Sequence, residues 1–486
     1  MTEPLPTPGP TGVRTAGDRF QWLVAWSACM AALLDSANGV ENPIVSVGVE
    51  VDGAGNLDDV VLYRMRPPNT YTQVKYTVDS STPANLAYLS APSSSGGRSI
   101  LAKVADTWRQ LTSSGEPVQL AIVSNRQTDP SDALLAARDS RTRRLLPRAA
   151  GTSGRVKHAR AAWATAAGLS EEELLRLLAV LDLDLGRDVG HLSDEARYAM
   201  AAVGLRGDES GLNAGIDWVA RQVVAGRRRL DLADIQEEIT TAALRIEDTR
   251  TIVSIATLLP DPLADHAAHA IDWVDRFDGD SPYVKRHPKP PATWAELQRD
   301  IEAIPSHLRG ATKVTVTGSI RLAPAFAVGA ALRMVTGFDV ATVQRGVLWP
   351  SDAPSPPPIV PSVIEHAVGL GDDLAVAVEI ATPMVDDVLA WIRSQSPPVA
   401  RLLVLRPADG PSNSAVDGPA AACAWAEGIR DTVRQAVAGH PRVHLFLATP
   451  MGLALLIGHR WNRVAPTVVY EDLGHLSYEP AFSAVA

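Results

Sequence analysis

Residues 47–76 read VGVEVDGAGNLDDVVLYRMRPPNTYTQVKY, and this stretch predicts a β-hairpin near the start of the chain. Residues 60–63 are an apolar run, VVLY, typical of a buried strand. Residues 71–76 alternate apolar and polar side chains, as a partner strand does. We therefore expect two paired strands, with the polar residues gathered at one end of the pair.

Polar groups suited to phosphate chemistry lie at that end. Gln73 and Lys75 are two positions apart, so on a strand their side chains point to the same face. An aspartate, Asp58 or Asp59, directly precedes the neighbouring strand. A carboxylate and a second oxygen ligand can hold Mg²⁺, and a nearby cation can steady the charge of a pentavalent phosphate. The same residues also fit a plain hairpin with a solvated outer face.

The order of Asp59, Gln73 and Lys75 resembles the PD-(D/E)xK nucleases, in the variant that reads D…QxK. The resemblance implies that Asp59 and Gln73 bind Mg²⁺ or Mn²⁺, with Gln73 in the position usually held by glutamate. It implies that Lys75 is the catalytic lysine, and that the reaction is cleavage of double-stranded DNA. Asp59 is preferred to Asp58 because it directly precedes the apolar strand.

The residues around the hairpin fit the same kind of domain. Residues 18–34 have apolar side chains at helical spacing. A helix at 101–111 and a buried strand at 117–124 would complete an αβββαβ-like core. Gln21 on the first helix is a candidate contributor to the metal site, and Glu50 is a candidate second acid. An exposed surface position is the alternative for both.

Composition limits the classes of protein to consider. The chain has 486 residues, of which 46% are hydrophobic, enough for two or three domains with large cores. Its two cysteines, Cys29 and Cys423, lie far apart, which is typical of a reducing cytoplasm. The first residues lack the basic and apolar regions of a signal peptide, and no apolar run reaches the ~18 residues of a membrane span. We expect a cytoplasmic protein without a membrane partner.

The net charge of −10 does not by itself indicate a nucleic-acid-binding protein. A local basic surface can nevertheless attract phosphates, because the attraction is short-ranged at physiological salt. Residues 141–160 contain seven cations and no acid. They are a candidate phosphate-contacting loop, with a solvated linker as the alternative. The cations are Arg141, Arg143, Arg144, Arg148, Arg155, Lys157 and Arg160.

The pattern of elements divides the chain into three parts. Residues 1–160 are predicted to form the nuclease-like α/β domain, and residues 161–285 a helical connector. A proline-rich stretch at 281–291 marks the next boundary. Strands and helices then alternate over 290–486, which predicts parallel, Rossmann-like sheets. Such sheets bind ligands at the carboxyl ends of their strands.

The end of the chain carries a second resemblance. Residues 444–471, HLFLATPMGLALLIGHRWNRVAPTVVYE, and residues 317–329, TGSIRLAPAFAVG, resemble the SAVED domain, the sensor module of CBASS antiphage effectors. The resemblance implies two fused CARF-like, Rossmann-type halves. It also implies that a cyclic oligonucleotide messenger, commonly a trinucleotide, binds, drives formation of a homo-oligomer and activates the attached nuclease.

Polar residues at the ends of the predicted strands are candidate ligand contacts. The turn after the strand at 313–318 offers a hydroxyl, a guanidinium and backbone N–H groups to a phosphodiester. For the arginine of this turn, a structural salt bridge is the alternative. The candidates are Ser319, Arg321, Thr382, Thr449 and Glu471.

Two other functions remain open from the sequence. The chain could be a cyclic-nucleotide sensor and assembly protein whose nuclease-like domain is degenerate, although Asp59, Gln73 and Lys75 are all present. It could also be a DNA-processing enzyme outside defence, with a Rossmann-like regulatory domain for another nucleotide. The 444–471 block favours the SAVED interpretation over this one.

Overall fold

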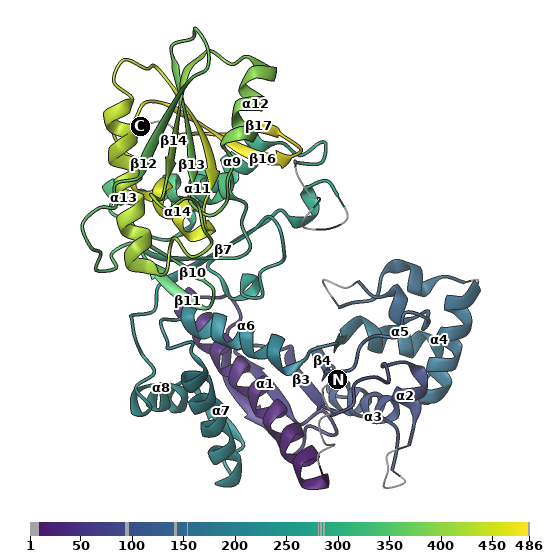
Figure 1. Cartoon of the computed structure of the whole chain (residues 1–486). Coiled ribbons are helices and arrows are strands. Elements are labelled where there is room, and N and C mark those ends of the chain that lie inside the picture. The colour runs from purple at the N-terminus through teal and green to yellow at the C-terminus, as the bar shows by residue number, and fades with distance from the viewer. Residues whose placement is uncertain are drawn as a thin grey trace. The chain divides into compact units, whose positions relative to one another are not determined.

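The computed structural model describes residues 9–92, 97–139, 143–152, 154–279, 281, 284 and 287–484. The chain forms two compact units, Met1–Asp248 and Thr249–Ala486. Each unit is described by itself below, and Figure 1 labels the elements of both.

A six-stranded sheet forms the centre of the N-terminal unit, in the order β5-β4-β3-β2-β1-β6. The predicted hairpin is confirmed, because β2 and β3 pair antiparallel with Val60 opposite Thr72. β3, β4 and β5 run parallel, so their carboxyl ends meet at one edge of the sheet. The strands are β1 (Ile44–Val49), β2 (Val60–Arg64), β3 (Asn69–Lys75), β4 (Val118–Ser124), β5 (Leu181–Leu185) and β6 (Arg229–Asp231).

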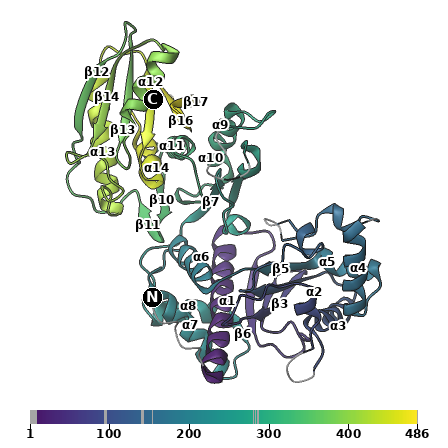
Figure 2. The ribbon, with the colours of Figure 1, turned by 45° about the vertical axis from the view of Figure 1, so that its right-hand side comes forward.

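Helices cover both faces of this sheet. α1 begins with a proline in its first turn, where the missing N–H costs nothing, and ends at Gly39, whose φ of 61° is left-handed. α3, α4 and α5 share one apolar core with the sheet, and Figure 2 shows α1 on the opposite side. The helices are α1 (Pro10–Asn38), α2 (Leu86–Ser90), α3 (Ile100–Thr112), α4 (Gly154–Ala167), α5 (Glu171–Val180), α6 (Val189–Ala202), α7 (Glu209–Val224) and α8 (Leu232–Thr241).

The expected helical connector over 161–285 differs from the structure. α4 to α8 belong to the N-terminal unit, and two strands of this segment, β5 and β6, complete its sheet. β5 alternates leucine and aspartate, so its leucines pack into the core while its backbone pairs with β4. The remainder of the segment begins the second unit at Thr249. Pairing between strands distant in sequence explains why this part is not a separate connector.

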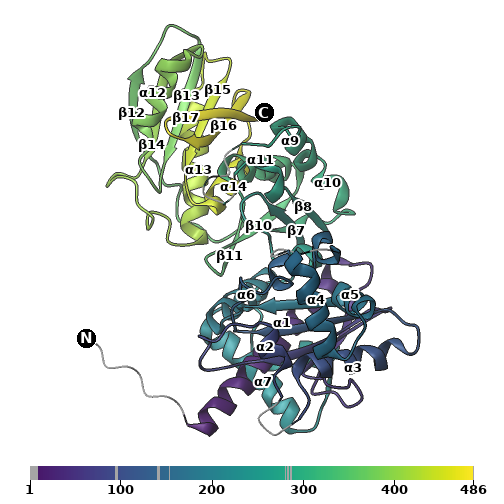
Figure 3. The same ribbon diagram turned by 90° about the vertical axis from the view of Figure 1, so that its right-hand side faces the viewer.

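Two sheets make up the C-terminal unit, in the orders β11-β10-β9-β7-β8 and β12-β14-β13-β15-β16-β17. Figure 3 shows both sheets with their helices. The strands of the first sheet are β7 (Thr251–Ala256), β8 (His269–Asp272), β9 (Lys313–Thr317), β10 (Asp339–Gln344) and β11 (Val347–Pro350). Those of the second are β12 (Ser362–Ala367), β13 (Asp373–Glu379), β14 (Val399–Arg406), β15 (Val443–Ala448), β16 (Thr467–Gly474) and β17 (Ser477–Ala484).

The central strands of both sheets are parallel, with antiparallel strands at β11, β12 and β17, and this confirms the expected α/β pattern. The helices of the unit are α9 (Trp294–Glu302), α10 (Ile304–His307), α11 (Leu322–Ala331), α12 (Val385–Gln395), α13 (Pro419–Ala436) and α14 (Met451–Arg460).

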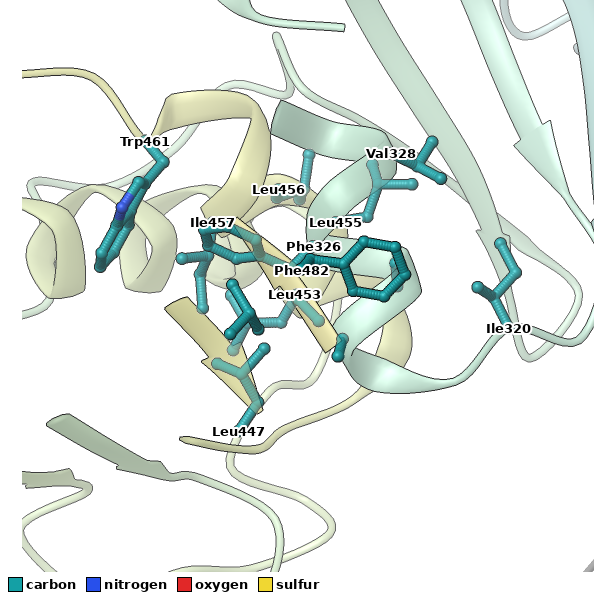
Figure 4. Packing of buried hydrophobic residues seen from close by; sticks show 14 of the residues in the cluster. Ile320, Phe326, Val328, Leu447, Leu453, Leu455, Leu456, Ile457, Trp461 and Phe482 are labelled. Carbon is teal, nitrogen blue, oxygen red and sulfur yellow. The ribbon is translucent and has the colours of Figure 1, made fainter. Parts of the chain in front are cut away.

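α11 and α14 join the two sheets into one apolar core. Phe326 of α11 and Leu453 of α14 lie fully buried in a cluster that contains strands of both sheets. Figure 4 shows Phe326 packed among leucines of α14 and Phe482 of β17. The helices approach each other backbone to backbone, which ties the two halves of the unit together.

Candidate functional site

The hairpin of the N-terminal unit brings the three predicted nuclease residues together. Gln73 donates a hydrogen bond from Nε2 to Oδ2 of Asp59. The backbone N–H of Val74 donates to the same carboxylate oxygen at 2.7 Å. Lys75 is the last residue of β3, two positions after Gln73, so both side chains lie on one face of the sheet. Asp59, placed just before β2, therefore lies at the end of β3 as expected.

The site is largely withdrawn from water. Gln73 is buried, and Asp59 and Lys75 are partly buried. Burial raises the pKa of Asp59 above its usual value, an effect that the nearby ammonium of Lys75 opposes and the carboxylate of Asp58 reinforces. Burial also lowers the pKa of Lys75, against the attraction of Asp59. The carboxylate and the ammonium thus act on each other across the site.

The two helper residues proposed from the sequence contact each other. Gln21 of α1 donates to Glu50 at 3.4 Å, and Glu50 also pairs with Arg228, which directly precedes β6. Glu50 meets Asp59 only through the backbone, its N–H donating to the carbonyl oxygen of Asp59 at 3.2 Å. Through these side-chain contacts Gln21 and Glu50 connect to Arg228, a residue that the sequence analysis did not single out.

The basic stretch is partly neutralised by acids that lie outside it in the sequence. Arg143 pairs with Asp184 at 2.8 Å and Arg160 pairs with Glu171 at 2.7 Å. Arg144 faces Asp182 at 3.7 Å. The guanidinium of Arg148 donates to the carbonyl of Ala136, while Arg155 and Lys157 are exposed on α4. Arg141 lies outside the described residues. The absence of acids within 141–160 therefore does not leave all of these cations free.

In the C-terminal unit, two of the five candidate ligand contacts form a pair. Arg321, at the start of α11, and Glu471 of β16 are both buried and lie 3.4 Å apart. Glu471 also accepts from the backbone N–H of Ala323 at 3.1 Å, so its carboxylate sits at the N-terminus of α11. Burial outweighs these partners and raises the pKa of Glu471 to about 7. The salt bridge that the sequence analysis kept as the alternative for Arg321 is present.

The other three candidates lie at strand ends. The carbonyl oxygen of Ser319 accepts from the N–H groups of Thr257 and Leu258, both at 3.0 Å. Thr382 is exposed, and Thr449 is buried and donates to the carbonyl of Pro450 at 3.1 Å. Thr382 and Thr449 follow β13 and β15, which are neighbouring parallel strands.

A second carboxylate of this kind was missed by the sequence analysis. Glu379 ends β13, is buried, and accepts from the N–H groups of Met384 and Val385 at 3.1 Å each. Arg406 lies 4.0 Å from it. Glu379 at α12 thus repeats the arrangement of Glu471 at α11. The signal was available, because Glu379 is an acid at the end of an otherwise apolar strand that a helix soon follows.

Within the described part of the chain, no group of three or more His, Cys, Asp or Glu side chains could hold a metal ion. The hairpin site differs from such clusters because an amide and one or two aspartates would supply its ligands. No described helix is long and apolar enough to cross a membrane.

Comparison with solved structures gives weak overall similarity along the whole chain. The Acinetobacter baumannii Cap4 SAVED/CARF-domain containing receptor, solved with the cyclic trinucleotide 3'3'3'-cAAA, matches with a TM-score of 0.42 and 13% identity. That match covers 99% of this chain and 100% of the other. The Moraxella osloensis Cap4 SAVED/CARF-domain containing receptor matches with a TM-score of 0.40 and 13% identity, covering 96% of this chain and 99% of the other.

Sequence comparison gives a relative and a domain family. CD-NTase-associated protein 4 of Enterobacter hormaechei subsp. hoffmannii is 23% identical over 473 residues, which cover 90% of this chain and 92% of that protein. Residues 297–483 match the family model of the SAVED domain, described as the "SMODS-associated and fused to various effectors sensor domain". The similarity to the SAVED domain family thus lies in the C-terminal part of the chain.

Proposed function

We propose that this protein is a CBASS antiphage effector in which a cyclic oligonucleotide, of the trinucleotide class, binds the SAVED domain and activates DNA cleavage by the N-terminal unit. The single observation that carries the proposal is the coexistence of two features in one chain. One is the SAVED match over 297–483, and the other is the Asp59–Gln73–Lys75 constellation on the hairpin. The relative named CD-NTase-associated protein 4, similar over most of the chain, supports a role beside a nucleotidyltransferase.

The hairpin site has the donor set that Mg²⁺ or Mn²⁺ requires. The carboxylates of Asp59 and Asp58 and the amide oxygen of Gln73 are hard oxygen ligands, and Mg²⁺ is commonly held by one or two carboxylates while keeping several waters. Burial and Asp58 both raise the pKa of Asp59, and a divalent cation would offset both effects. The residues fit the metal. When bound, it would activate a water and neutralise charge on the phosphate.

The protein residues would divide the remaining work. The amide of Gln73 and the N–H of Val74 hold the carboxylate of Asp59 in one orientation. Lys75 carries its ammonium on the same face as Gln73, where it would steady the negative charge that develops on the phosphate. Partial burial strengthens that interaction because little water screens it.

Plasmid cleavage tests the proposal. Full-length protein is incubated with supercoiled plasmid and Mg²⁺, alone and with a panel of cyclic di-, tri- and tetranucleotides. Light scattering on the same samples follows homo-oligomer formation. We expect degradation with one messenger only, together with assembly. A messenger that binds and drives assembly without any cutting would favour the second candidate, a sensor with a degenerate nuclease domain.

A further inference from the structure

A second lysine, Lys103, lies on a helix that packs over the sheet near Lys75. Lys103 is in the first turns of α3 and is partly buried, like Lys75 at the end of β3. Lys75 lies on the same face of β3 as Tyr71, which packs in one apolar cluster with Leu101 and Val104 of α3, so α3 covers the face of the sheet that carries Lys75. Burial lowers the pKa of Lys75, and the charge of Lys103 lowers it further. The sequence analysis missed Lys103 because it lies 28 residues beyond Lys75, on a helix rather than on the hairpin.

Contacts of α3 explain how Lys103 reaches this position. Thr107, one helical turn after Lys103, is buried and accepts a hydrogen bond from the backbone N–H of Asn56 at 2.9 Å. Thr107 also packs so closely on Gly55 that a β-carbon there would lie 2.6 Å from its hydroxyl. Residues i and i+4 share a face of a helix. The face of α3 that carries Lys103 and Thr107 therefore lies against the loop that leads into Asp58 and Asp59.

The carboxylates of Asp59 and Asp58 attract the ammonium of Lys75, but neither lysine forms a close ion pair in the described part of the chain. Among the residues that the structure describes, no carboxylate lies within 4.0 Å of Lys75 or Lys103, whereas Arg98, just before α3, pairs with Asp106. Two partly desolvated ammonium groups that repel each other carry an electrostatic cost. Asp59 and Asp58 offset part of that cost at Lys75, and an anion bound between the two lysines would offset more of it. The reaction proposed for this site supplies such an anion, a DNA phosphodiester.

We propose that Lys75 and Lys103 together form a binding site for the scissile phosphate of DNA, with Lys103 as a phosphate-contacting residue on the side of α3. This inference rests on the proposed nuclease function. It adds a specific residue to it, and it predicts that Lys103 contributes to DNA binding even when no metal is present.

Chemical labelling of lysines tests the inference without relying on activity. Full-length protein is acetylated with acetic anhydride in EDTA, with and without duplex DNA, and the labelled lysines are quantified by mass spectrometry. We expect DNA to protect Lys75 and Lys103 several-fold more than Lys313, an exposed lysine of β9 in the other unit. Equal labelling of Lys103 in bound and free protein would overturn the phosphate site while leaving the nuclease proposal intact.

Matched variants give the second test. For Lys103→Ala we expect DNA affinity to fall about 10- to 100-fold and the slope of log affinity against log salt to lose about 0.9, the value of one phosphate contact. Lys103→Arg should keep most of the DNA affinity and most of the salt slope. Lys313→Ala should change neither the affinity nor the slope.

The outcomes separate the two proposals. A normal affinity and salt slope in Lys103→Ala, with cleavage by the wild-type protein intact, would refute the two-lysine site alone. If the wild-type protein neither binds nor cuts duplex DNA under any of these conditions, the nuclease proposal fails and the phosphate site fails with it.

Discussion

Gln73 occupies the position that is usually held by glutamate in the nucleases that this hairpin resembles. A glutamate there would add a second negative charge next to Asp59. The Nε2 of Gln73 donates to Asp59, whereas a carboxylate at the same position would repel it. The glutamine thus lets a partly buried aspartate keep a hydrogen-bond donor when no metal is bound. Its consequence is a site with less negative charge, and so a weaker attraction for a divalent cation.

Replacing Gln73 by glutamate should therefore lower the Mg²⁺ concentration needed for half-maximal cleavage, by roughly tenfold. The measurement is a Mg²⁺ titration of plasmid cleavage in the presence of the activating messenger. Gln110→Glu, at an exposed position of α3, makes the same change in net charge away from the site. An unchanged or higher Mg²⁺ requirement in Gln73→Glu would speak against Gln73 as a metal ligand.

Glu471 should make stability depend on pH. Burial raises its pKa to about 7 in the folded state, compared with 4.5 for an unperturbed glutamate. The raised pKa means that the folded state favours the protonated form of Glu471. The stabilisation that comes from this protonation is fully present below pH ~4.5 and is lost as pH rises through ~7. At about 1.4 kcal/mol per pKa unit, the loss is roughly 3 kcal/mol.

Urea unfolding of the wild-type protein and Glu471→Gln between pH 5 and pH 8 measures this effect. We expect the wild-type protein to lose stability relative to the variant as the pH rises. Glu302→Gln, at an exposed position of α9, should follow the wild-type protein at every pH. A stability difference between the wild-type protein and Glu471→Gln that stays constant across the range would contradict the assignment.

At the scale of elements, the crossing of α11 and α14 depends on two glycines. A β-carbon at Gly458 would lie 2.0 Å from the carbonyl oxygen of Phe326, and one at Gly329 would lie 2.0 Å from that of Leu455. Backbone atoms cannot move aside as a flexible side chain can. The glycines thus permit the close contact through which these helices join the two sheets of the unit.

Gly458→Ala should destabilise the C-terminal unit by about 1–3 kcal/mol, because the added methyl group forces the helices apart. Gly17→Ala, on α1, is a matched change with open space around it, and it should be neutral or slightly stabilising. Thermal unfolding followed by tryptophan fluorescence compares the two. Equal transition temperatures for both variants would show that the crossing tolerates a wider separation.

The elements predicted correctly from sequence are those with local signals. The hairpin was found because Asp59, Gln73 and Lys75 lie within 17 residues on adjoining strands. β5 was missed because its five residues follow helix α5 directly, and its pairing partner β4 lies far earlier in the chain. The placement of Lys103 near Lys75 could not be predicted either, since it depends on how α3 packs against the loop before β2.

The same limit applies to charged groups. Residues 141–160 contain no acid, yet Arg143 and Arg144 face Asp184 and Asp182 of β5. Arg321 and Glu471 were both singled out as ligand contacts, and their mutual pairing across 150 residues could not be predicted from spacing. The sequence thus predicted polar and charged residues near strand ends, while long-range packing determined their partners.

At the scale of the whole molecule, the function we propose places messenger sensing and DNA cleavage in different units. The SAVED match lies entirely within Thr249–Ala486, and the hairpin lies entirely within Met1–Asp248. Messenger binding should therefore survive the loss of the nuclease site. A messenger at 100 times its Kd should stabilise the folded protein by about 2.7 kcal/mol.

Thermal shift with the activating messenger tests this separation. Asp59→Asn should show the same messenger-dependent rise in melting temperature as the wild-type protein, although it no longer cuts DNA. A rise that disappears in Asp59→Asn would mean that the nuclease residue takes part in messenger binding or in the fold of the sensor.

The rate of plasmid cleavage, measured with and without messenger for the wild-type protein and Lys75→Ala, tests the central claim most directly. We expect cleavage that requires both Mg²⁺ and one cyclic oligonucleotide, and that is abolished in Lys75→Ala while messenger binding is unchanged. Full cleavage without any messenger, or undiminished cleavage by Lys75→Ala, would contradict a messenger-gated nuclease built on this hairpin.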